Sequence, residues 1–214
     1  MENNETLEKI AINLEKALDN GALPEPELLE YYKGLEERTI WIDYDIDESL
    51  LEVAKQIIRI NREDAKNHIP VEKRKPIKLL IYTYGGDCGA MFALIDAIEM
   101  SKTPVYTYNM GKALSAGFQI LISGHKRFCV SHSTALYHSG SGGTMGTYEQ
   151  TEAQMNEYKR LVALMQENCL SKTRIDKKLF AKNKAKDWFM SSKEQLEYGV
   201  VDAIITDIDE IYNL

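Results

Sequence analysis

Short apolar runs alternate with segments of helical periodicity along most of the chain. Compact apolar runs predict strands at 39–42, 78–83, 104–109, 127–130, 135–137 and 201–205. Apolar residues that recur every three or four positions predict helices at 47–60, 90–100, 116–123, 148–169 and 193–198. The run 78–83 is almost wholly apolar, as is typical of a strand buried on both faces of a parallel sheet. This alternation predicts an α/β fold with right-handed crossovers.

Residues 1–37 precede this pattern and form the first of two predicted parts. Apolar residues between positions 7 and 18 have mostly helical spacing, and Asn20 followed by glycine would end that helix. A second short helical stretch follows at 27–34, after two prolines. We therefore predict a helical N-terminal extension at 1–37 and one larger domain at 38–214.

Composition and charge narrow the class of protein. Of the 214 residues, 33 are acidic and 26 basic, for a formal net charge of −7, which argues against nucleic acid as the main partner. No apolar run is long enough to cross a bilayer, and the acidic first ten residues do not resemble a signal peptide. The three cysteines are widely spaced and lack a CxxC motif, which favours reduced thiols in a cytoplasmic protein. We expect no metal and no cofactor.

Ser115 occupies the predicted junction between a strand and a helix, in the sequence GKALSAG. At the start of a helix a serine can act as an N-cap. It can also be a nucleophile, because unpaired backbone N–H groups and the helix dipole stabilise an oxyanion there. The small neighbours Ala113, Ala116 and Gly117 would let a substrate backbone approach closely. This stretch alone leaves both interpretations open.

A serine nucleophile needs a base, and the chain offers four histidines. His68 lies in a predicted polar loop, His125 lies in a basic turn, and His132 and His138 bracket a predicted strand. His138 begins a glycine-rich loop at the end of that strand, where α/β folds form ligand crevices. The pair Gly85-Gly86 ends another strand, and two glycines allow a close backbone approach.

Taken together, these segments resemble the Clp protease proteolytic subunit family (the ClpP family), over about residues 38 to 206. The resemblance implies the ClpP/crotonase fold of repeated β-β-α units, with a protruding handle helix at 148–169. Four segments arrive in the family's order: Ile81–Gly86 (IYTYGG), Gly111–Phe118 (GKALSAGF), Leu136–Gly143 (LYHSGSGG) and Asp187–Asp202 (DWFMSSKEQLEYGVVD).

The resemblance also implies roles for individual residues. Ser115 corresponds to the nucleophile, His138 to the general base and Asp187 to the residue that orients the imidazole, as in a Ser-His-Asp triad. Asp176 and Asp202 are rivals for the third role. Asp202, however, corresponds to the aspartate that ends the family's last segment, where its role is structural. The backbone N–H groups of Gly86 and Ala116 correspond to the oxyanion hole, and Gly85, Gly142 and Gly143 to peptide-binding positions, with a short strand and turn at 142–146.

The resemblance implies a serine endopeptidase that cuts peptides or unfolded proteins inside a homo-oligomeric chamber, formed by a heptameric ring or a double ring. Three features depart from the family pattern: Tyr84 replaces a proline, Ala116 replaces a methionine, and residues 1–37 replace a pore-lining hairpin. The last departure argues against coupling to an AAA+ ATPase unfoldase.

Three alternatives remain open at this point. The chain could be a non-catalytic ring subunit or scaffold, because its N-terminus and its glycine turn are altered. It could be a crotonase-like acyl-CoA enzyme, which would use the two oxyanion amides without the triad. It could also be a serine-lysine peptidase that uses Lys112, three residues before Ser115.

Overall fold

The structure is a computed structural model that describes residue 34 and residues 37–212. The chain divides into two compact units, Met1–Thr39 and Ile40–Leu214. The predicted helical extension at 1–37 lies almost wholly outside the described residues and stays a prediction.

Seven strands of the described chain form one sheet, in which β1, β2, β3, β4 and β7 lie in that order. β5 pairs with β3 away from this path and with β6 on its other side. The pairs β2–β3, β3–β4, β3–β5 and β4–β7 are parallel, whereas β5–β6 is antiparallel. The strands are β1 (Thr39–Ile42), β2 (Ile77–Thr83), β3 (Val105–Leu114), β4 (Lys126–Val130), β5 (Thr134–Tyr137), β6 (Trp188–Ser191) and β7 (Ala203–Ile205).

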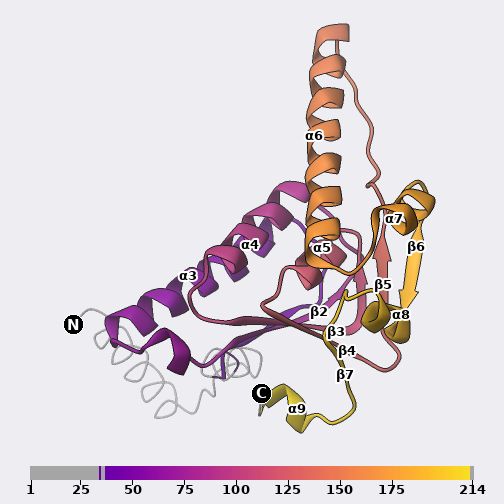
Figure 1. The fold of residues 1–214 in the computed structure, drawn as a ribbon. Helices are drawn as coiled ribbons and strands as arrows, with labels where there is room; N and C mark the ends of the chain where they lie inside the picture. The colour runs from indigo at the N-terminus through magenta and orange to yellow at the C-terminus, as the bar shows by residue number, and fades with distance from the viewer. Residues whose placement is uncertain (1–33, 35–36, 213–214) are drawn as a thin grey trace, which may run out of the picture. The chain divides into compact units, whose positions relative to one another are not determined.

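Helices connect most of these strands, which confirms the predicted α/β class. α3, α4 and α5 lie together on one side of the sheet, and α6 extends beyond them as the predicted handle (Figure 1). No helix within the described part of the chain is both long and apolar enough to span a membrane. The helices are η1 (Glu48–Leu50), α3 (Leu51–Lys66), η2 (Val71–Lys73), α4 (Cys88–Met100), α5 (Ala116–Ile122), α6 (Tyr148–Lys172), α7 (Lys177–Asn183), α8 (Ser192–Glu197) and α9 (Asp209–Tyr212).

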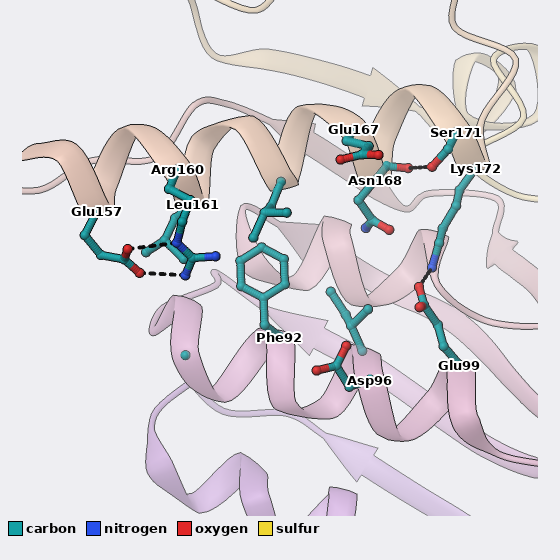
Figure 2. Close-up of a pocket in the computed structure, with 13 residues that line it drawn as sticks. Phe92, Asp96, Glu99, Glu157, Arg160, Leu161, Glu167, Asn168, Ser171 and Lys172 are labelled. Carbon is teal, nitrogen blue, oxygen red and sulfur yellow. Dashed lines mark hydrogen bonds and ion pairs between the residues drawn. The ribbon is translucent and has the colours of Figure 1, made fainter.

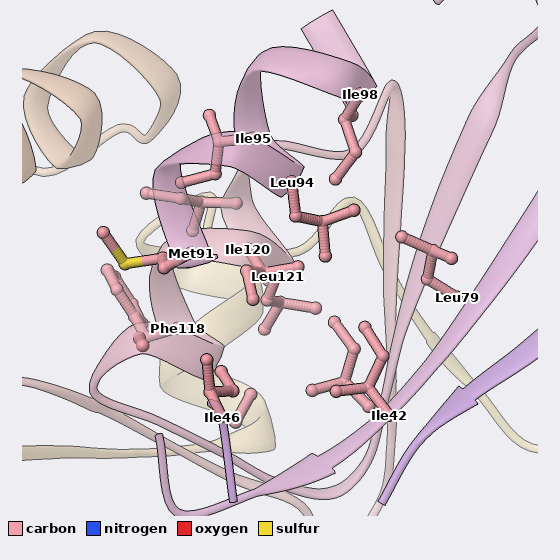
Figure 3. Packing of buried hydrophobic residues seen from close by; sticks show 14 of the residues in the cluster. Ile42, Ile46, Leu79, Met91, Leu94, Ile95, Ile98, Phe118, Ile120 and Leu121 are labelled. Carbon is pink, nitrogen blue, oxygen red and sulfur yellow. The ribbon is translucent and has the colours of Figure 1, made fainter. Parts of the chain in front are cut away.

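The main hydrophobic core lies between these helices and the sheet. α4 directs Met91, Leu94, Ile95 and Ile98 inward, the face that its periodicity predicts, and all four are buried. Figure 3 shows this row packed against residues of α5, β1 and β2. Burial of these side chains fixes α4 and α5 against the strands whose carboxyl ends carry the candidate site.

Several element boundaries differ from the predictions. The helix predicted to end at residue 60 continues to Lys66, because Ile60 and Asp64 extend its buried face. The polar loop predicted around His68 is therefore shorter than the polar sequence indicates. The strand predicted at 104–109 continues to Leu114, so the sequence GKAL is strand and not turn. The short strand predicted near Gly142 is wrong, because residues 138–146 form neither strand nor helix.

Candidate active site

Ser115 lies in a strained turn between β3 and α5. Its backbone has φ 55° and ψ −115°, a conformation that costs a non-glycine residue about 1–3 kcal/mol. The turn is held from two sides: the Ser115 N–H donates to Leu136 O at 3.0 Å, and Ser115 O accepts from Phe118 N at 3.1 Å. The side chain makes no capping hydrogen bond, so the N-cap interpretation of Ser115 is wrong for its hydroxyl.

His138 supplies the hydrogen-bond partner of that hydroxyl. β3 and β5 are parallel, with Leu114 beside Leu136, so their carboxyl ends lie together and each strand ends just before one of the two residues. His138 Nε2 lies 2.6 Å from Ser115 Oγ. When Nε2 carries no proton, it can accept the serine proton, which is the geometry that a general base requires.

Asp187 lies on the other side of the same imidazole. β6 runs antiparallel to β5 with Trp188 opposite Tyr137, so the residue before β6 faces the residue after β5. Asp187 Oδ1 is 3.8 Å from His138 Nδ1, within ion-pair range but too long for a good hydrogen bond, and its side chain is 67% exposed.

The two rival aspartates have other partners. Asp176 Oδ1 accepts from the backbone N–H groups of Lys178 and Leu179 and caps α7. Asp202 accepts from the Arg127 guanidinium at 2.6 Å. Both carboxylates are therefore used elsewhere, and the structure brings Asp187 to His138.

Gly85 and Gly86 form a turn that lies directly against Ser115. A Cβ on Gly85 would lie 2.7 Å from Ser115 Cβ and 3.0 Å from Ala116 N, so this approach requires glycine. Thr83 fixes the turn, because its hydroxyl donates to Tyr44 O at 2.6 Å and accepts from Gly85 N at 3.1 Å.

The candidate oxyanion donors are the backbone N–H groups of Gly86 and Ala116, each next in the chain to the close contact between Gly85 and Ser115. On either side of Gly86, Gly85 O accepts from Ile46 N and Asp87 N donates to Ile46 O, both at 2.8 Å. Within residues 37–212, neither the Gly86 nor the Ala116 N–H donates to another protein group. Two free amides beside a serine–histidine pair can stabilise the charge that develops in acyl transfer.

The remaining candidate bases lie apart from this pair. His125 Nδ1 accepts a hydrogen bond from Val105 N, at the start of β3, at 3.0 Å. Lys112 donates to the Tyr84 hydroxyl and lies 4.1 Å from the centre of that ring, and this hydrogen bond raises the pKa of the lysine. A protonated Lys112 bound to Tyr84 is not placed to act as a base for Ser115.

The loop after His138 contributes to a groove along α6. Gly142 and Gly143 line one side of this groove of about 330 Å³, and Met155, Tyr158 and Leu161 line the other. The groove is mostly apolar at its helical wall and begins at the loop that carries His138.

A separate groove of about 630 Å³ lies between α4 and α6 (Figure 2). Phe92 and Asp96 project into it from α4, and Lys172 from α6 forms an ion pair with Glu99. The candidate catalytic residues do not line it, and it is not the candidate active site.

The next question is whether the described residues include a metal-ligating cluster or a reactive thiol. Across residues 37–212 no group of three or more histidine, cysteine, aspartate or glutamate side chains is arranged to hold a metal ion. Cys88, Cys129 and Cys169 are free thiols, and burial raises the pKa of Cys169 to about 12. These thiols stay protonated at neutral pH and are poor nucleophiles.

Comparison with known proteins identifies the family and agrees with the fold. The sequence profile of the Clp protease family matches residues 26–208, so the chain belongs to this family of peptidases and is a hydrolase. The ATP-dependent Clp protease proteolytic subunit 2 of Treponema denticola is 33% identical over 139 residues, which cover 64% of this chain and 70% of that protein. The family resemblance seen in the sequence is thereby confirmed.

Two further relatives match over more of their length. Subunit 2 of the same protease from Treponema pallidum is 28% identical over 182 residues, 84% of this chain and 87% of that protein. Subunit 1 from Borreliella burgdorferi is 29% identical over 178 residues, 82% and 88% of the two chains. All three relatives are named as proteolytic subunits, which is consistent with a peptidase.

Proposed function

We propose that this chain is a serine endopeptidase with Ser115 as nucleophile, His138 as general base and Asp187 as the residue that orients the imidazole. The observation that carries the proposal is the 2.6 Å contact between Ser115 Oγ and His138 Nε2, beside two free backbone amides. A hydroxyl is a weak nucleophile until a base removes its proton, and this contact supplies the base.

In the first half of the reaction, Ser115 Oγ attacks the carbonyl carbon of the scissile peptide bond while His138 Nε2 takes the hydroxyl proton. The negative charge moves to the carbonyl oxygen, where the N–H groups of Gly86 and Ala116 donate to it. As the carbon–nitrogen bond breaks, Nε2 returns its proton to the leaving amine, and an acyl-serine remains. Water, deprotonated by His138, then releases the acid and restores Ser115.

Asp187 acts through His138. A carboxylate near Nδ1 favours the tautomer with the proton on Nδ1, which leaves Nε2 free to accept from Ser115, and it stabilises the imidazolium that forms. At 3.8 Å the two groups need a small closure to form a hydrogen bond. Substrate binding is the natural occasion for that closure, since catalytic contacts often tighten in the complex.

We propose that the substrates are peptides or unfolded proteins, bound in extended form along Gly142 and Gly143. Main-chain hydrogen bonds to such a segment require little from the substrate's side chains. By family membership we also propose a homo-oligomeric ring with the active sites facing its chamber. The relatives are named as subunits of an ATP-dependent protease, but we do not extend the proposal to an ATPase partner, because residues 1–37 depart from the family's hairpin.

Three free cysteines, two of them buried, fit a reducing compartment, and we propose that the enzyme works in the cytoplasm.

The test compares cleavage of a fluorogenic peptide by the unaltered protein, Ser115→Ala and Ser171→Ala. Ser171 lies on α6 beside the other groove and donates to Asn168 O, so its variant is a matched control. We expect Ser115→Ala to abolish cleavage while its native mass and circular dichroism stay unchanged, and Ser171→Ala to cleave normally. Undiminished cleavage by Ser115→Ala would overturn the proposed function.

A further inference from the structure

The residue that follows His138 is held by two hydrogen bonds from different elements. The Ser139 hydroxyl donates to the carbonyl oxygen of Lys184 at 2.9 Å. The Ser139 carbonyl oxygen accepts from the Tyr158 hydroxyl at 3.0 Å. Ser139 therefore ties the loop of the proposed base both to α6 and to the segment that follows α7.

This loop needs such anchoring, because the sheet no longer holds it. β5 ends at Tyr137, so His138 is the first residue beyond the ladder, and residues 138–146 form no strand or helix. Backbone outside regular structure depends on side-chain hydrogen bonds to hold one conformation. A displacement of Ser139 would move the adjacent His138 with it.

Tyr158 is built into the loop and not merely near it. It is half-buried, whereas its neighbours from 152 to 157 and at 159 and 160 on α6 are exposed. Gly140 has φ 84°, and a Cβ there would lie 3.0 Å from the Tyr158 hydroxyl oxygen. The same ring lies 4.0 Å from the place where Gly142 would carry a Cβ. The tyrosine thus packs on the backbone of three loop residues.

The second anchor connects to the acid of the proposed triad. Lys184 is the C-terminal cap of α7, and Asp187 comes three residues later, just before β6. Asp187 is largely exposed and lies 3.8 Å from His138, so its own contacts hold it weakly. The hydrogen bond from Ser139 to Lys184 O joins the base loop to the acid loop directly and limits how far the two can separate.

We propose that Tyr158 and Ser139 are positioning residues that align His138 with Ser115 and Asp187. The inference rests on the proposed function, since it concerns the same triad, and it gives α6 a part in the geometry of the active site. Neither residue touches the reacting atoms. Each acts on the imidazole through the loop backbone.

The test compares two variants of α6 that each lose one tyrosine hydroxyl. Tyr158→Phe is the test variant and Tyr148→Phe is the matched control. Tyr148 begins the same helix and is 76% exposed. For Tyr158→Phe we expect kcat for peptide cleavage to fall about fivefold, the rate equivalent of one neutral hydrogen bond, with KM nearly unchanged. Tyr148→Phe is expected to match the unaltered protein. Ser139→Ala should lower kcat similarly, and Ser139→Thr, which keeps the hydroxyl, should restore most of it.

A second readout separates positioning from substrate binding. A small fluorophosphonate reacts with the activated serine without occupying the groove along α6, so its rate of reaction should fall in Tyr158→Phe by the same factor as kcat. A rise in KM with unchanged kcat and unchanged labelling would mean that Tyr158 only binds peptide, and would overturn the inference. So would full activity in Tyr158→Phe.

Failure of the proposed function looks different from failure of the inference. If the unaltered protein neither cleaves peptide nor reacts at Ser115, the proposed function fails and the inference fails with it. If the unaltered protein does both and Tyr158→Phe is indistinguishable from it, the inference fails alone.

Discussion

Replacement of Gly86 by alanine tests the proposed oxyanion hole through its backbone. The residue has φ 146°, and a Cβ there would lie 2.0 Å from Ile46 O. Real Cβ atoms essentially never come closer than 3.0 Å, so the turn must move away from Ile46 by about 1 Å or more. That movement carries the Gly86 N–H away from its place beside Ser115.

Two costs follow from this displacement. The backbone conformation itself should cost the alanine variant about 1–3 kcal/mol in the free energy of unfolding. Loss of one oxyanion donor lowers kcat by about a hundredfold to a thousandfold, and a shift of about 1 Å in a catalytic group has an effect of about a hundredfold. We therefore expect kcat/KM of Gly86→Ala to fall by at least about a hundredfold.

The assay is peptide cleavage well below the unfolding temperature, with circular dichroism to confirm that the variant is folded. Gly89→Ala is the matched control: this glycine lies in the first turn of α4, and the nearest atom to its added Cβ is the side-chain Asp87 Oδ1, at 3.1 Å. We expect the control to stay within about twofold of the unaltered protein. A folded Gly86→Ala variant with unchanged kcat/KM would refute the role of this amide.

Two further predictions concern stability. The Arg127 side chain donates to Asp202 and to Gly199 O. Arg127→Ala should therefore lower the free energy of unfolding in urea by about 1–3 kcal/mol. Arg127→Lys lacks the planar guanidinium group and should recover less than half of that loss. Equal stability of Arg127→Ala and the unaltered protein would contradict this. Burial raises the pKa of Cys169 to about 12 in the folded protein, so as the pH rises the thiol of the unfolded chain loses its proton before that of the folded chain. The free energy of unfolding should therefore fall from about pH 9 toward pH 12. Urea titrations should show a shallower fall in Cys169→Ala; identical slopes would exclude the thiol as the cause.

The sequence predicted most of the elements because their apolar periodicity is strong. The buried face of α4 is the one that its periodicity predicts. Ser191 and Glu194 cap α8 reciprocally, a pairing that the spacing of serine and glutamate also indicates. The β3 boundary was missed because Gly111 and Lys112 are typical turn residues. The structure keeps them in the strand, with Lys112 beside Thr134 of β5. Between the pairs Ile81–Asn109 and Thr83–Ala113, β3 carries two more residues than β2, an irregularity that no periodicity reveals.

The sequence predicted only those residues of the candidate site that lie in short, recognisable motifs. Ser115, His138 and Asp187 each stand at a recognisable segment end, and the structure brings them together through the pairing of β5 with β3 and β6. β6 itself was missed although Trp188 and Met190 alternate with exposed neighbours, because the segment is four residues long. Tyr158 could not be identified from the sequence, since its contact with Ser139 depends on how α6 lies beside a loop 19 residues earlier.

The proposed function depends above all on Ser115 acting as a nucleophile activated by His138. The most direct measurement is the intact mass of the purified protein after treatment with a fluorophosphonate, alongside Ser115→Ala and His138→Ala. We expect a single adduct on the unaltered protein and none on either variant, because the serine is missing in one and its base in the other. An adduct that persists in Ser115→Ala, or an unaltered protein that takes up none, would contradict it.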